Sequence, residues 1–248
     1  MGETSTSLVE RFRDEAAQAG ALVHEARDVD DARGYILQMA EERGVTRVVK
    51  SRSTLAVEMG LRRHLEDAGM AVTEVDVGEW LAQLAANSQA GDGAEGEGAT
   101  IERVAGLVST AAGEEVEADA RAVAKAARAV LRQCCIDADM GVSEASVAIA
   151  ETGTLVIAGD EGGERLAAVL PRIHVTVVDA ANVVATMDDA SARLKGPGEM
   201  GQRMPRYVTY VTGRNTTADI PGALLARAQG PMEEHVVLVS RDVARRGV

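Results

Sequence analysis

Short apolar runs alternate with amphipathic helical segments along the first 85 residues, and this alternation restricts the fold more than any other feature. A helical pattern over residues 8–19 precedes an apolar run at 21–24, and a helix opening at Asp28 and ending by Gly44 precedes a second run at 46–49. Strands that alternate with helices pair in parallel, because each helix must cross back over the sheet. The sequence therefore predicts an α/β fold with a mostly parallel open sheet and helices on both faces.

The same kind of pattern continues along the chain. Further helices are predicted at 54–68, 79–85, 101–112, 117–136 and 164–170, and further strands at 71–75, 173–178, 207–212 and 235–239. Apolar runs at 147–150 and 155–158 flank Thr152-Gly153, which predicts an inserted β-hairpin. Residues 87–99 are acidic and rich in glycine, so we expect a flexible surface loop there. We expect residues 1–248 to form one domain, with residues 1–45 as its helical and β start.

Charge and cysteine content exclude several classes of protein. The net charge is −13, which opposes binding to nucleic acid or to an anionic membrane. The sequence has neither a membrane-spanning apolar stretch nor a secretory leader, so it predicts a cytoplasmic protein without membrane insertion. Its two cysteines, Cys134 and Cys135, are adjacent, which excludes a disulfide framework and an iron–sulfur cluster. The histidines lack a metal-ligand spacing, and we predict no metal site.

The first candidate site follows the strand predicted at 46–49 and reads Lys50-Ser51-Arg52-Ser53-Thr54. A turn from strand to helix presents unpaired N–H groups and the positive end of the helix dipole. Together with a cation and hydroxyl groups, this predicts an anion-binding loop made by Lys50, Ser51, Ser53 and Thr54. The alternative is that Ser53 only caps the following helix.

The second candidate site combines Asp139 with the turn Glu151-Thr152-Gly153-Thr154. A carboxylate between an apolar strand and a glycine turn is partly removed from water, which raises its pKa and suits proton transfer or covalent chemistry. The alternative is a turn carboxylate that accepts hydrogen bonds from its own backbone.

The third candidate site is Pro171-Arg172-Ile173-His174, at the start of an apolar strand. Arg172 is suited to bind a carboxylate or phosphate with two hydrogen bonds, and His174 could titrate near neutral pH. The alternative for His174 is a structural residue with satisfied hydrogen bonds. Because no nucleotide fingerprint follows an early strand, the sequence identifies no cofactor.

Several of these segments together resemble the LUD domain, which occurs in the bacterial lactate-utilisation proteins B and C. The resemblance covers about residues 30 to 240. It rests on the ordered elements 50–53 (Lys-Ser-Arg-Ser), 58–61 (Glu-Met-Gly-Leu), 138–142 (Ala-Asp-Met-Gly-Val), 148–154 (Ala-Ile-Ala-Glu-Thr-Gly-Thr), 171–174 (Pro-Arg-Ile-His), 230–231 (Gly-Pro) and 234–238 (Glu-His-Val-Val-Leu). The Lys-Ser-x-Ser element is more typical of the B-type protein.

The resemblance implies a fold similar to the NagB/RpiA/CoA-transferase-like group. It also implies a part in oxidising L-lactate to pyruvate within a complex that contains iron–sulfur redox proteins. The matching positions imply that Glu151, His174 and Asp139 are catalytic candidates, and that a small organic acid or phosphate-bearing ligand contacts the Lys50 loop, residues 152–154 and Arg172.

The sequence departs from the B-type pattern in two places. It ends at Val248 without the cysteine-rich, ferredoxin-like region of B-type proteins, so we expect any electron transfer to need partner proteins. The acidic loop at 87–99 stands where B-type relatives carry another segment. Two alternatives stay open: a transferase or isomerase that uses Glu151, and a non-catalytic scaffold. A homodimer is a further expectation, because the alanine-rich helix at 117–136 needs apolar cover.

Overall fold

A six-stranded parallel sheet forms the centre of the computed structural model, which describes residues 5–88, 100–195, 204–214, 216–220, 223–226 and 230–239. Every neighbouring pair in this sheet is parallel. Across the sheet the strands are β1 (Leu22–Ala26), β12 (Glu233–Val239), β7 (Ile173–Asp179), β4 (Met140–Glu144), β2 (Arg47–Lys50) and β3 (Ala71–Glu74). The predicted α/β class with a parallel sheet is confirmed.

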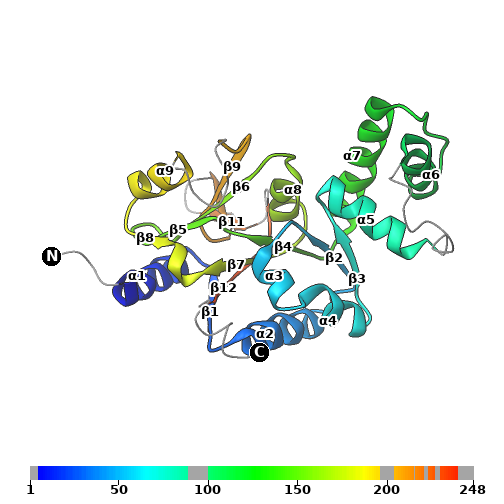
Figure 1. The fold of residues 1–248 in the computed structure, drawn as a ribbon. Coiled ribbons are helices and arrows are strands. Elements are labelled where there is room, and N and C mark those ends of the chain that lie inside the picture. Colours follow the sequence, from blue (N-terminus) through cyan, green and yellow to red (C-terminus); the bar gives the residue numbers. More distant parts are fainter. Residues whose placement is uncertain are drawn as a thin grey trace.

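Three helices cover the first face of the sheet, which is the lower side in Figure 1. They are α2 (Val29–Glu42), α3 (Thr54–Glu58) and α4 (Leu61–Asp67). Asp28 starts α2 by accepting a hydrogen bond from Asp31 N. Ile36 and Leu65 from these helices are fully buried against strand residues such as Val175. This apolar layer is the largest cluster of buried side chains in the described residues and fixes the helices to the sheet.

The second face is covered by helices and by a smaller sheet. The helices are α1 (Ser5–Gln18), the end of α7 (Ala120–Asp137) and α8 (Gly163–Val169). The smaller sheet has the order β8 (Val183–Val184), β5 (Val147–Ile149), β6 (Thr154–Gly159) and β9 (Tyr207–Val211). The predicted hairpin is present as β5 and β6, which pair antiparallel. It is the middle of a four-stranded sheet, because β8 and β9 extend it on either side.

Three helices project beyond the β3 edge of the main sheet, at the right of Figure 1. They are α5 (Val77–Asn87), α6 (Ile101–Ala112) and the first turns of α7. Their buried side chains form a separate apolar cluster around Trp80, with Val108 and Leu131. Most of the predicted acidic loop at 87–99, residues 89–99, lies outside the described residues.

Some sequence predictions were incomplete. The predicted helix over 54–68 is two helices, because Gly60 adopts a left-handed conformation with φ of +57° between α3 and α4. The central strand β4 was missed, as was α9 (Met187–Lys195). The remaining elements are a 3₁₀ turn (Ala180–Asn182) and an antiparallel pair, β10 (Thr216–Ile220) with β11 (Ala223–Ala226).

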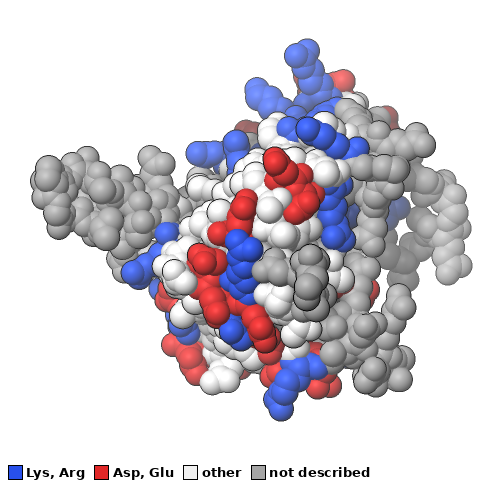
Figure 2. All heavy atoms as spheres, turned by 90° about the vertical axis from the view of Figure 1, so that its left-hand side faces the viewer, with Lys and Arg blue, Asp and Glu red and all other residues white. Residues whose placement is uncertain are grey.

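The surface carries charges of both signs. Figure 2 shows the side of the molecule at the left of Figure 1, where basic and acidic side chains are interspersed. The net charge of −13 is therefore not displayed as one acidic patch on this face. Among the described helices, none has the length and apolar character that crossing a membrane requires.

Candidate functional site

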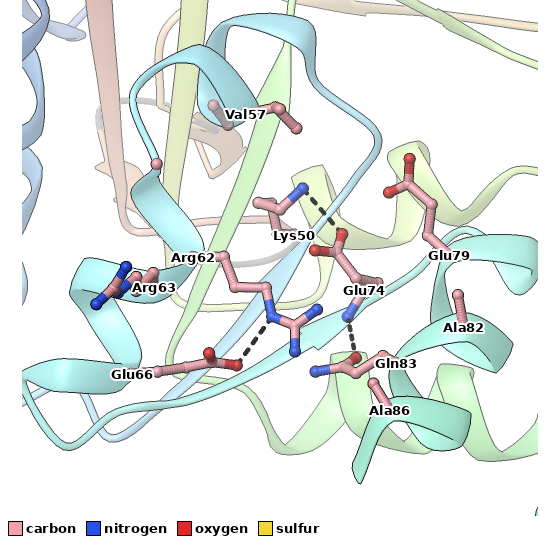
Figure 3. A pocket seen from close by; sticks show the side chains of 12 residues that line it. Lys50, Val57, Arg62, Arg63, Glu66, Glu74, Glu79, Ala82, Gln83 and Ala86 are labelled. Carbon is pink, nitrogen blue, oxygen red and sulfur yellow. Dashed lines mark hydrogen bonds and ion pairs between the residues drawn. The ribbon is translucent and has the colours of Figure 1, made fainter. Parts of the chain in front are cut away.

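A cavity of about 580 Å³ opens at the carboxyl ends of β2 and β3. Its position matches the edge of an open α/β sheet where ligands usually bind. Its walls come from the ends of these strands, from α3 and α4, and from α5 (Figure 3). The residues that line it are Lys50, Ala56, Val57, Gly60, Arg62, Arg63, Glu66, Glu74, Glu79, Ala82, Gln83 and Ala86. We call this space the Lys50 cavity.

A buried ion pair lies at the base of the Lys50 cavity. Lys50 and Glu74 are partners in the β2–β3 register, and Lys50 Nζ lies 2.9 Å from Glu74 Oε2. Their side chains are only 3% and 7% exposed. Burial raises the pKa of the Glu74 carboxyl above its ordinary value, and Lys50, which acts in the opposite direction, does not cancel this effect. Glu74 is therefore a carboxyl group that accepts a proton more readily than an exposed glutamate.

Other polar groups converge on the same cavity. Gln83 holds the β3 backbone, because its Nε2 donates to Val72 O at 2.6 Å and its Oε1 accepts from Glu74 N at 3.1 Å. Arg62 extends from α4 into the space between α4 and α5 and pairs with Glu66 at 2.9 Å (Figure 3). A buried lysine and a partly exposed arginine around one cavity are the groups that a small anion would contact.

The predicted anion loop is adjacent to this cavity, but its hydroxyl groups face elsewhere. Ser53 caps α3 by accepting from Ala56 N at 2.9 Å, as the alternative reading expected. It also donates to Glu144 Oε2 at 2.8 Å, and Leu55 N donates to the same oxygen at 3.1 Å. The carboxylate of Glu144, at the end of β4, therefore accepts hydrogen bonds from the hydroxyl and N–H groups at the start of α3 that were predicted to bind an anion.

Two other loop residues also lie outside the cavity lining. The Ser51 hydroxyl is buried without a hydrogen-bond partner in the described part of the chain, and Thr54 is exposed. Of the four residues predicted to form the anion loop, the structure thus places only Lys50 in the cavity. Anion binding by the other three stays a prediction.

Asp139 and Arg172 lie at the opposite, amino-terminal edge of the sheet. Asp139 precedes β4, and its Oδ2 accepts hydrogen bonds from Thr46 N, Thr46 Oγ1 and Arg47 N. Burial alone would raise the pKa of Asp139, but these bonds outweigh it and lower the pKa. The predicted rise in pKa is therefore wrong for this residue. Arg172 donates to Arg43 O at 2.9 Å, and its Nε lies 3.9 Å from Asp139 Oδ1.

The turn with Glu151 lies in a third region. Glu151 Oε1 accepts from Met187 N, at the start of α9, on the opposite side of Figure 1 from β3. Thr152 donates to Thr154 Oγ1 at 2.7 Å, and the Thr154 hydroxyl is 2.8 Å from that of Thr212. Gly153 has a φ of +62°, and a Cβ there would lie 2.2 Å from the backbone of α1. The structure does not bring this turn together with Lys50.

His174 lies inside the main sheet, in a buried polar network that sequence analysis did not predict. Its Nε2 is 2.6 Å from Ser143 Oγ, and its Nδ1 is 2.7 Å from Glu234 Oε2. Thr176 donates to Glu234 Oε1 at 2.9 Å. The four residues are completely buried and come from β4, β7 and β12.

The contacts resemble a Ser–His–acid triad, but the four residues line neither cavity described here. Catalysis by His174 therefore stays a prediction. Polar residues at alternate positions of an otherwise apolar strand, His174 and Thr176, were the signal that sequence analysis could have used. For the cavity residues Glu74 and Arg62 no such signal exists, because glutamate and arginine are common on exposed surfaces.

A smaller cavity of about 280 Å³ lies near β1 and β12. His235 Nδ1 is 2.8 Å from the hydroxyl of Tyr35, and Nε2 is 3.2 Å from Glu233 Oε2. The pKa of His235 is lowered, mainly by burial.

Among the described residues, no group of three or more histidine, cysteine or acidic side chains could hold a metal ion.

The family model described as the LUD domain matches residues 9–239. The chain belongs to the LUD domain family. Among curated proteins, this LUD domain is 28% identical over 231 residues to an uncharacterized electron transport protein, YkgF, of Escherichia coli. It is also 28% identical over 234 residues to lactate utilization protein B of Bacillus licheniformis. These matches cover 92% and 93% of the chain and 47% of each relative, so the chain spans about half the length of these relatives.

A solved structure supports the fold of the LUD domain. It is a DUF162 family protein from Deinococcus radiodurans, with a TM-score of 0.52 and 16% sequence identity. The alignment covers 96% of this chain and all of that one. The family model confirms the resemblance to the LUD family proposed from the sequence, and the solved structure confirms the fold.

Proposed function

We propose that this LUD domain binds a small carboxylate, such as L-lactate or pyruvate, in the Lys50 cavity. We further propose that it takes part in the oxidation of L-lactate to pyruvate together with iron–sulfur redox proteins. The observation that carries the proposal is the Lys50 cavity itself, where a buried ammonium group and Arg62 face one space. Its volume of about 580 Å³ lies within the range of roughly 300–1,000 Å³ typical of small-molecule sites.

The names of the relatives support the metabolic part of the proposal. Lactate utilization protein B of Bacillus licheniformis and of Shouchella clausii are both 28% identical to this chain. The chain covers less than half of each of these relatives, and electron transfer by iron–sulfur partner proteins is carried over from the sequence analysis as part of this proposal. A cytoplasmic location and a homodimer, both expected from the sequence, stay predictions.

The alternative of a transferase or isomerase that uses Glu151 receives no support from the geometry. The Glu151 carboxylate accepts a hydrogen bond from Met187 N, and Glu151 does not line the Lys50 cavity. A catalytic residue must reach the reacting atoms. A ligand bound at the Lys50 cavity would therefore not be in contact with Glu151.

The test is a thermal-unfolding assay with L-lactate, pyruvate, inorganic phosphate and coenzyme A, each titrated at several pH values between about 5.5 and 8. A ligand at 100 times its dissociation constant stabilises the fold by about 2.7 kcal/mol, which corresponds to roughly 5–10 °C in Tm for a chain of this size. We expect this shift with a carboxylate, and we expect Arg62→Gln to reduce it.

Arg27→Gln is the matched control for Arg62→Gln. Arg27 also pairs with a carboxylate four residues ahead, Asp31 at 3.1 Å, but it does not line the Lys50 cavity. The control should show the wild-type shift. If neither L-lactate nor pyruvate raises Tm at any pH, or if both variants lose the shift equally, the proposed carboxylate site is wrong.

A further inference from the structure

We propose that the Lys50 cavity takes up one proton with its anionic ligand, and that Glu74 is the group that receives it. In this scheme the ligand carboxylate replaces the Glu74 carboxylate as the counter-ion of Lys50. The inference rests on the proposed function and adds how pH regulates the same site. It also identifies Glu74, which no sequence motif marks, as a residue that controls ligand affinity.

The geometry of the ion pair is the first argument. The charge of Lys50 is already balanced, because its Nζ lies 2.9 Å from Glu74 Oε2 and also donates to Ser51 O at 3.3 Å. Gln83 holds the β3 backbone that leads into Glu74 through hydrogen bonds with Val72 O and Glu74 N. An anion that approaches Lys50 therefore also approaches a carboxylate that cannot move far away. Protonation of Glu74 removes this repulsion and leaves the lysine charge free for the ligand.

The charges around the cavity are the second argument. Three cations line it, Lys50, Arg62 and Arg63, and so do three carboxylates, Glu66, Glu74 and Glu79. With all six groups ionised, the lining carries no net charge and has little attraction for an anion. One proton on Glu74 gives the lining a net charge of +1.

The remaining charged groups already have partners on their own elements or nearby. On α4, Arg62 lies 2.9 Å from Glu66, and Arg63 lies 3.7 Å from Asp67. On α5, Glu79 lies 3.5 Å from Arg52, which belongs to the loop before α3. Glu79 also faces Glu74, and its negative charge and a side-chain hydrogen bond raise the pKa of Glu74 further. These ion pairs are partly or largely exposed, with side-chain exposures of 33–85%, so water can screen them. The Lys50–Glu74 pair is shielded from such screening, and burial also raises the pKa of Glu74.

The test is isothermal titration calorimetry of the wild-type protein with L-lactate and with pyruvate, which remain ionised above about pH 5.5. At each pH, the titration is made in two buffers of different ionisation enthalpy. Uptake of a proton makes the measured enthalpy depend on the buffer, and the dependence gives the number of protons bound. We expect up to one proton per ligand, and a Kd that rises about tenfold per pH unit above the pKa of Glu74.

Two variants identify the group that receives the proton. Glu74→Gln keeps the shape of the side chain without its charge, so its Kd should be independent of pH and its binding enthalpy independent of the buffer. Asp67→Asn removes a carboxylate from α4 that does not line the cavity, and it should bind with the same proton uptake as the wild type. If Asp67→Asn changes the pH dependence as much as Glu74→Gln does, the effect is one of overall charge and the assignment to Glu74 is overturned.

The outcomes separate this inference from the proposed function. Binding of a carboxylate to the wild-type protein without proton uptake over the whole pH range overturns the inference and leaves the carboxylate site in place. Failure of both ligands to bind at any pH overturns both. If Glu74→Gln does not fold, the wild-type comparison between buffers still tests the inference, because the absence of proton uptake overturns it.

Discussion

The buried pair of Lys50 and Glu74 allows a quantitative test of how the cavity is held together. The perturbation is a double-mutant cycle with Lys50→Met, Glu74→Gln and the combination of the two. Both side chains are at most 7% exposed, and the charged atoms are 2.9 Å apart. Removing one partner of such a pair leaves the other charge buried and unpaired, which costs about 3–5 kcal/mol of unfolding free energy. Removing both leaves no buried charge.

These values fix the size of the expected coupling. If each single substitution costs about 3–5 kcal/mol, independent effects would sum to about 6–10 kcal/mol, which approaches the whole stability of a typical domain. Because the double variant buries no unpaired charge, we expect it to be no less stable than either single variant. The coupling free energy should therefore be at least about 3 kcal/mol.

The sign of the pH effect follows from the pKa of Glu74, which burial raises above the ordinary value of 4.5. Loss of Lys50 removes the group that lowers this pKa, so in Lys50→Met the folded state holds a proton that the unfolded state releases. Its stability should be highest below about pH 4.5 and fall as the pH rises through the folded-state pKa. The destabilisation by Lys50→Met should therefore be smaller in acid than at pH 7.

The assay is urea denaturation of the four proteins followed by circular dichroism, at about pH 5 and pH 7. The matched control is a second cycle on Arg62 and Glu66, whose side chains are 33% and 40% exposed and pair at 2.9 Å. An exposed pair of this spacing contributes only about 0.3–0.5 kcal/mol. Additive effects at Lys50 and Glu74, within about 0.5 kcal/mol, would refute the assignment of a coupled buried pair.

Three other predictions follow from individual residues. Gly141→Ala should lower the unfolding free energy measured by denaturation by at least about 2 kcal/mol, because the new Cβ would lie 1.9 Å from Ala167 O. The control is Gly106→Ala, whose Cβ meets nothing within 4 Å and should stabilise α6 slightly. The pKa of Asp139 is lowered below its ordinary value of 3.8. Its contribution to stability is therefore complete above that pH and disappears as the pH falls through the folded-state pKa. In an acid titration, Asp139→Asn should lose unfolding free energy less steeply than the wild type. Burial raises the pKa of the Cys135 thiol to about 12 and also raises that of Cys134. The buried Cys135 thiol should therefore react with a disulfide reagent at about pH 8 only after unfolding, and fast modification of Cys135 in the native protein would contradict its burial.

The main features of the fold could be predicted from the sequence because they are written in local patterns. Alternating strands and helices predict a parallel sheet, and the strands at 71–75 and 173–178 were placed within one residue of β3 and β7. The strand β4 was missed because Gly141 and Ser143 interrupt its apolar run. Only the packing of α8 against this strand explains the glycine, since Ala167 O occupies the place of a side chain there.

The candidate site was predicted less completely, because its residues come together only through the order of the strands. Lys50 was found from its place after a strand, where a parallel sheet presents its ligand-binding edge. Glu74 could not be paired with it, because the sequence does not tell that β2 and β3 are neighbours with Lys50 opposite Glu74. The same lack of tertiary information grouped Asp139 with the turn at Glu151 and gave Arg172 the same ligand as the Lys50 loop, although Asp139 and Arg172 lie at the other edge of the sheet.

The residues that carry the family resemblance mainly have structural explanations. Gly141 allows α8 to approach β4, Gly153 allows α1 to approach the hairpin turn, and His174 joins three strands through Ser143 and Glu234. These roles concern packing within this chain and do not depend on which ligand it binds. Apart from Lys50, the cavity draws polar groups from residues such as Arg62, Glu74 and Gln83, which lie outside every motif named above. Substitutions of the more exposed cavity residues on α4 and α5 should therefore change ligand affinity with smaller effects on folding than substitutions in the motifs, and a ligand screen informs most when it compares variants of those two helices.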